Sequence, residues 1–136
     1  MTATYDGLQF KTPLEAQWAA FFDLAGWTWH VNPLPVENWA PDFRVSFPCG
    51  HSECSGSHTL LVAVLPISGL DGLQSHPSLS HLYDPSVPAD ACALFGASPA
   101  ITTWDMVHGS GSGIEEVSFW VPNADKLWAK AATLIS

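Results

Sequence analysis

Four side chains of the kinds that bind zinc lie close together near the middle of the chain. Cys49, His51, Cys54 and His58 follow one another through a segment rich in glycine and serine. Structural zinc sites take a tetrahedral set of thiolates and imidazoles, so the segment 48–58 could close around one Zn²⁺ ion. The spacing is not that of a standard zinc finger, and the alternative is a surface loop whose cysteines and histidines bind no metal.

Two carboxylates, Glu15 and Asp42, form the second group that could do chemistry. Asp42 follows Pro41 and would lie beside a buried strand. Each carboxylate also has a structural interpretation. Glu15 completes a capping box, in which it would reach back to the Thr12 amide, and Asp42 could bond backbone amides at the start of a strand.

A helix and two strands must position these carboxylates. The pattern from Thr12 to Glu15 marks the start of a helix that ends before Gly26. Residues 60–67 form an unbroken apolar run, which is typical of a central strand buried on both faces. Residues 41–47 alternate in polarity, which predicts a neighbouring, half-buried strand.

The other patterned segments complete an α+β domain. Residues 27–32 and 91–96 are predicted strands, and residues 101–121 are a predicted hairpin whose return strand is 117–121. A last helix is predicted after Asn123, with an apolar side made of Leu127, Trp128, Ala131 and Leu134. We expect one domain, residues 1–136, with a small mixed sheet of about five to six strands and a helix at each end.

Two segments fall outside these elements. Residues 1–11 are expected to be a lead-in that docks on the domain through Tyr5, Leu8 and Phe10. Residues 68–90 are rich in glycine, serine and proline and form a long loop. A loop of that length in a compact domain is usually functional, mobile or ordered by a partner.

The charge balance narrows the choice of partners. Thirteen acidic residues against four Lys and Arg give a formal charge of -9. Such a surface disfavours direct nucleic-acid binding, which depends on neutralising phosphates with cations, and favours a basic protein surface. No membrane span or signal peptide is evident, and three cysteines suit a reducing compartment, so we expect a cytoplasmic protein.

The order of motifs resembles the PD-(D/E)XK nuclease-like proteins of phages and mobile elements. The resemblance rests on residues 14–22, which contain Leu-Glu-Ala-x-Trp-Ala, followed by Pro41-Asp42-Phe43 and by the apolar strand that ends in Pro66. Residues 93–99 are similar to the downstream strand and turn of that family. The resemblance implies a restriction-endonuclease-like core and a Mg²⁺-dependent site that cleaves DNA in the cytoplasm of a bacterial host.

The resemblance also implies roles for individual residues. Glu15 and Asp42 would be the first two metal ligands, and the next strand should carry a Glu-x-Lys pair. That strand has Ala63 in place of the acid and Leu65 in place of the lysine. Rescue would require Glu37, Glu53 or a histidine of the 68–90 loop as ligand, with Arg44 as the cation.

Three interpretations follow. The first is a catalytically inactive nuclease-fold protein that binds another protein, in one version an inhibitor of a basic, nucleic-acid-binding defence enzyme of the host. The second is an active Mg²⁺-dependent endonuclease with a relocated site. The third is a structural module stabilised by Zn²⁺ at Cys49, His51, Cys54 and His58.

Overall fold

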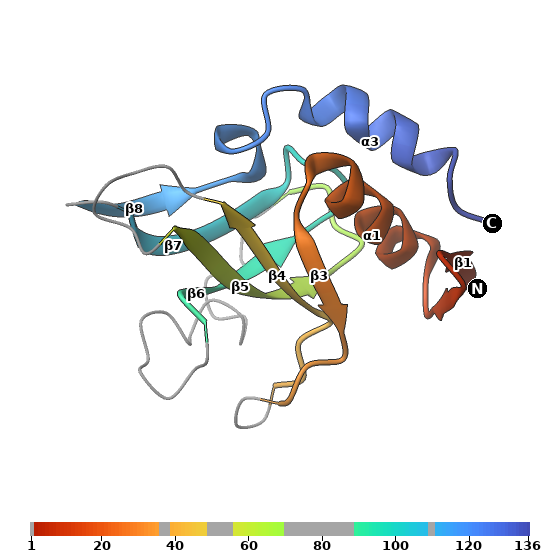
Figure 1. Cartoon of the computed structure of the whole chain (residues 1–136), viewed down its shortest axis with the longest axis horizontal. Coiled ribbons are helices and arrows are strands. Elements are labelled where there is room, and N and C mark those ends of the chain that lie inside the picture. The colour runs from red at the N-terminus through yellow and green to blue at the C-terminus, as the bar shows by residue number, and fades with distance from the viewer. Residues whose placement is uncertain (1, 36–38, 49–55, 70–88, 109–110) are drawn as a thin grey trace.

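Six strands form one mixed sheet in the order β3-β4-β5-β6-β7-β8 (Figure 1). Every neighbouring pair is antiparallel except β5 and β6, which are parallel. The computed structural model describes residues 2–35, 39–48, 56–69, 89–108 and 111–136. The strands are β3 (Thr28–Val31), β4 (Phe43–Pro48), β5 (Ser57–Val64), β6 (Ala91–Phe95), β7 (Thr102–His108) and β8 (Gly111–Glu115). The expected α+β architecture with a mixed sheet of six strands is therefore confirmed, whereas the separate two-stranded sheet of β1 and β2 was not expected.

Strand β5 is buried on both faces, as its apolar run predicts. Leu60 and Val62 belong to the main core beneath the helices, whereas Leu61 and Ala63 pack with Trp39 on the opposite face. Successive side chains of a strand point to opposite faces, so an unbroken apolar run suits a strand with apolar cover on each side. The register of β4 against β5 is specified instead by β4, whose Phe43, Val45 and Phe47 are buried and would turn to the other face in a one-residue slip.

Helix α1 (Pro13–Ala25) brings the aromatic side chains of the main core onto the sheet. Its N-cap is Thr12, whose hydroxyl accepts a hydrogen bond from the Glu15 amide at 3.2 Å, and Gly26 ends it with a φ of 79°. Trp18 is fully buried, and its indole donates to the Gly96 carbonyl at 3.0 Å. The helix is thus anchored to the turn that follows β6.

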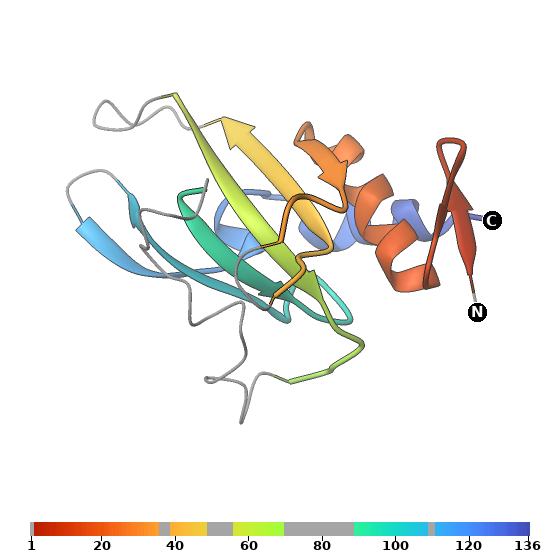
Figure 2. The same cartoon turned by 90° about the horizontal axis from the view of Figure 1, so that it is seen from below.

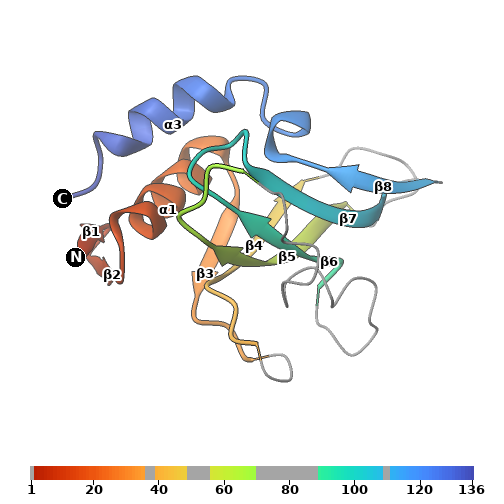
Figure 3. The ribbon, with the colours of Figure 1, turned by 180° about the vertical axis from the view of Figure 1, so that it is seen from behind.

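The predicted last helix is confirmed as α3 (Ala124–Ala132) after Asn123. It lies beside α1 over the same face of the sheet (Figure 3), and the rings of Trp128 and Trp18 have centroids 4.4 Å apart. Leu134 lies beyond the helix end and is 42% exposed, so its expected place on the apolar side was wrong. Among the described residues, no helix is long and apolar enough to cross a membrane.

The expected lead-in, residues 1–11, contains a hairpin that was not predicted. Its strands, β1 (Ala3–Tyr5) and β2 (Leu8–Phe10), are joined by Asp6 and Gly7, which have φ values of 53° and 78°. Two positive φ angles belong to the tight turn for which Asp-Gly is the preferred sequence. Phe10 is buried as expected, but Leu8 is 42% exposed.

The return strand of the second hairpin differs from the prediction. β7 pairs with β8, so that Trp104 lies opposite Glu115, and Val117–Phe119 form a 3-10 turn, η1. Pairing ends there because the Thr102 hydroxyl accepts a hydrogen bond from the Val117 amide at 3.0 Å and turns the chain inward. The predicted return strand at residues 117–121 was therefore wrong. Most of the predicted long loop, residues 70–88, lies outside the described residues.

Candidate functional site

Asp42 lies where the ladder between β4 and β5 ends. The Asp42 amide donates to the Val62 carbonyl at 2.8 Å, and the next residue back along the chain is Pro41, which has no amide. Beside this bond, the Asp42 side chain accepts the Val64 amide through Oδ2 at 2.8 Å. The structural interpretation of Asp42, a carboxylate that bonds a backbone amide at a strand start, is confirmed.

Lys11 supplies the cation of the site. Its Nζ lies 2.9 Å from Oδ1 of Asp42 and 3.8 Å from Oε1 of Glu15. The Asp42 contact is also a hydrogen bond, which raises the pKa of Lys11 and keeps the ammonium charged. Arg44, the cation that rescue of the site would have required, is instead exposed on β4 opposite His30.

Glu15 projects from the first turn of α1 and is only 7% exposed. Burial raises the pKa of its carboxyl, and the charge of Asp42 raises it further, whereas Lys11 and the Thr12 hydroxyl act in the opposite direction. The Thr12 hydroxyl lies 3.3 Å from Oε2 of Glu15. The predicted capping box is therefore corrected in one detail, because the Glu15 carboxylate meets the hydroxyl of Thr12 rather than its amide.

A pocket of about 170 Å³ surrounds these three side chains. It is lined by Leu8, Gln9, Phe10, Lys11, Glu15, Val31, Asn32 and Asp42. Two carboxylates share one ammonium, so the ionised site carries one net negative charge. The sequence-predicted pair of Glu15 and Asp42 is thus brought together, with Lys11 as a third member that the sequence analysis did not include.

The strand beside Asp42 contributes no further polar side chain at the expected positions. Ala63 is buried in the apolar cluster with Trp39, Leu61 and Cys92, and Leu65 is half-buried. The remaining rescue candidates, Glu37, Glu53 and the histidines of residues 70–88, lie outside the described residues.

The zinc prediction rests on residues that the structure largely does not describe. Cys49, His51 and Cys54 lie outside the described residues, whereas His58 lies in β5 and is 5% exposed. Its ring packs against Phe47, with centroids 5.8 Å apart, and its Nδ1 lies 3.5 Å from Oδ2 of Asp90. Within the described part of the chain, no group of three potential metal ligands occurs. Zinc binding remains a prediction.

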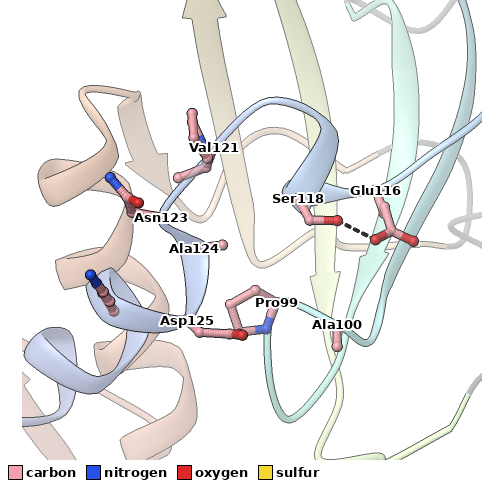
Figure 4. Close-up of a pocket in the computed structure, with 10 residues that line it drawn as sticks. Pro99, Ala100, Glu116, Ser118, Val121, Asn123, Ala124 and Asp125 are labelled. Carbon is pink, nitrogen blue, oxygen red and sulfur yellow. Dashed lines mark hydrogen bonds between the residues drawn. The ribbon is translucent and has the colours of Figure 1, made fainter.

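A second hollow, of about 430 Å³, lies between the turn after β6, η1 and the start of α3 (Figure 4). Glu116 and Asp125 are the carboxylates in its lining, and they lie on opposite sides of it. Glu116 accepts a hydrogen bond from the Ser118 hydroxyl. Because the two carboxylates do not converge, this hollow offers no ion site comparable to that of Lys11, Glu15 and Asp42.

No family model, curated protein or solved structure matches the chain. The function is therefore inferred from the contacts of the described residues.

Proposed function

We propose that this chain is a catalytically inactive nuclease-fold protein that acts by binding another protein. The observation that carries the proposal is that both carboxylate oxygens of Asp42 already accept hydrogen bonds from the protein itself. One carboxylate oxygen accepts the Lys11 ammonium at 2.9 Å, and the other accepts the Val64 amide at 2.8 Å. Each oxygen therefore already accepts a hydrogen bond. The two donors, an ammonium and a backbone amide, cannot themselves ligate a metal.

The same contacts disfavour a working Mg²⁺ site. Mg²⁺ demands nearly octahedral oxygen coordination and holds its waters tightly, so it needs carboxylates that are free to approach it. Here an ammonium lies within reach of both Glu15 and Asp42, and Ala63 provides no third carboxylate. A metal would have to displace Lys11, and it would gain only two charged ligands.

The net negative charge of the chain favours a protein over a nucleic acid as the partner. The chain has four Lys and Arg against thirteen Asp and Glu, and one of the four, Lys11, is already paired within the site. An acidic surface accelerates and orders the encounter with a basic one. A basic, nucleic-acid-binding protein of the host is the partner class that this charge fits, and inhibition of a defence enzyme by a phage or mobile element is one such role.

A cleavage assay tests the absence of catalysis. Supercoiled and single-stranded DNA are incubated with the protein and Mg²⁺ or Mn²⁺, beside Asp42→Asn and Glu15→Gln, which keep side-chain size. The expected result is no cutting by any of the three. Cutting by the native chain that both substitutions abolish, while the exposed-site control Asp125→Asn keeps it, would overturn the proposal.

One observation favours a second candidate, the metal-dependent endonuclease with a relocated site. Two carboxylates and a lysine meet in one pocket, and these are the residue types such nucleases use. In that case Lys11 would assist the attacking water, and Lys11→Met would lose cleavage together with Asp42→Asn. The same assay therefore separates the two functions.

A further inference from the structure

A groove follows the outer edge of β3. It has a volume of about 490 Å³ and is lined by the five consecutive residues 27–31, together with Asp6, Leu8 and Asp23. Figure 2 shows the hairpin of β1 and β2 standing apart from the six-stranded sheet, with α1 between them. Consecutive lining residues show that the groove runs along the strand rather than opening at one point of it.

The backbone of β3 offers hydrogen-bonding groups to this groove. The Asn32 amide donates to the Asp42 carbonyl at 3.2 Å, so residues of the same parity, such as His30, face β4. In an antiparallel ladder the alternate residues then direct their amides and carbonyls outward. These are Trp29 and Val31, and no described residue outside the ladder bonds to their backbone. β3 is therefore a strand edge that can accept another strand.

The lining combines two carboxylates, Asp6 and Asp23, with apolar and aromatic side chains and with the polar side chains of Thr28 and His30. Asp23 is held in place by two donors, the Tyr5 hydroxyl at 2.5 Å and the Trp29 indole at 2.8 Å. Asp6 is exposed at the hairpin turn, and Leu8 is 42% exposed. No Lys or Arg lines the groove among the described residues. An occupant must therefore be extended, partly apolar and positively charged.

We propose that an extended basic segment of a partner protein adds to β3 as a further strand of the sheet. Its backbone bonds Trp29 and Val31, and its Lys or Arg side chains face Asp6 and Asp23. Main-chain pairing supplies the affinity in this mode of recognition, and the flanking side chains supply specificity. The inference rests on the proposed protein-binding function and names the surface and the chemistry of the partner.

Three synthetic hexapeptides test the inference. The probe is acetyl-(Lys-Val)3-amide, the charge control is acetyl-(Glu-Val)3-amide, and the third is the basic peptide with alternate amides N-methylated, so that one edge cannot pair. We expect the basic probe to bind at least about tenfold more tightly than either control. In NMR spectra the Trp29 and Val31 amides should gain protection from exchange. Equal binding of the N-methylated peptide, shifts confined to β8, or no binding at all would overturn the inference.

Two variants of the protein test whether the basic probe binds at the edge of β3. Val31→Pro removes an outward amide that the ladder with β4 does not use, and Asp6→Asn removes one charge at a turn position that Asn tolerates. Both should weaken probe binding, whereas Asp125→Asn, with the same loss of charge on α3, should not. If Val31→Pro loses its fold, the N-methylated peptide still decides the question on the native chain.

The peptide-binding assay and the cleavage assay can fail independently, so each tests its own proposal. DNA cutting that depends on Asp42 would refute the inactive-scaffold function without bearing on β3. Conversely, a protein that cuts no DNA but ignores the basic probe would leave that function intact and refute the β3 surface.

Discussion

At the scale of single residues, Lys11 controls the electrostatics of the site. Lys11→Met keeps the apolar stem and removes the charge that opposes burial and Asp42 at Glu15. We expect the pKa of Glu15 to rise in a carboxyl NMR titration. Unfolding free energy should fall by no more than about 1 kcal/mol, because the lysine is largely exposed. Lys130→Met, an exposed lysine of α3, should leave the Glu15 titration unchanged; an unchanged titration in Lys11→Met as well would contradict this role.

The raised pKa of Glu15 predicts how the stability of the fold depends on pH. Its pKa is raised above the ordinary 4.5, so the folded state binds more protons than the unfolded chain between the two values. Stability contributed by Glu15 is therefore present at low pH and lost as the pH rises through that interval. Urea unfolding of Glu15→Gln and the native chain should show the variant gaining relative stability as the pH increases from about 4 to about 7. A relative stability that stays flat or falls would mean that burial does not govern this carboxyl.

The residue-level site was only partly predictable. The types and positions of Glu15 and Asp42 follow from local signals, a helix start and a strand start, and both were found in one pocket. Lys11 was missed because its main contact, to Asp42, joins residues 31 positions apart, and only the fold shows such a contact. One local signal existed, since Lys11 and Glu15 have the four-residue spacing that favours an ion pair at a helix start.

At the scale of elements, the turn after β6 joins α1 to the sheet. A Cβ on Gly96 would lie 2.6 Å from Cγ2 of Ile101 and 2.9 Å from the Ile67 carbonyl oxygen. Gly96→Ala should therefore lower the unfolding free energy by about 1–3 kcal/mol, because backbone and a packed side chain must move. Gly69→Ala, where a Cβ meets nothing within 4 Å, is the matched control. Equal urea unfolding midpoints for Gly96→Ala and Gly69→Ala would contradict this prediction, because they would show that the turn can shift to admit the Cβ at no cost in stability.

Elements with a strong local pattern were predicted well. α1 carries a cap, a proline and a terminal glycine, and β5 carries an apolar run, so each is specified by its own residues. β8 was misplaced because its Gly-Ser-Gly sequence has no strand signal and its pairing is set by β7. The hairpin at residues 3–10 was overlooked although its Asp6-Gly7 turn is a recognised signal.

At the scale of the whole molecule, net charge should govern the response to salt. A formal charge of -9 at neutral pH makes the folded chain repel itself, and salt screens that repulsion. We expect the urea midpoint to rise with moderate NaCl at pH 7 and to change little near the isoelectric pH of about 4.7. A midpoint that falls with NaCl at pH 7 would show that attractive pairs such as Lys11 and Asp42 outweigh the repulsion.

Because β5 and β6 pair in parallel across a long connection, we expect the folding reaction to have an early and a late part. β3, β4 and β5 are successive antiparallel neighbours, so they can assemble from contacts near in sequence, whereas β6 pairs with β5 only after the segment between Val64 and Ala91 closes. Val45→Ala in β4 should therefore slow folding, and Leu94→Ala in β6 should mainly accelerate unfolding, as stopped-flow chevron plots would reveal. The junction between β5 and β6, in the middle of the sheet, would then be the part that opens first when the native molecule unfolds.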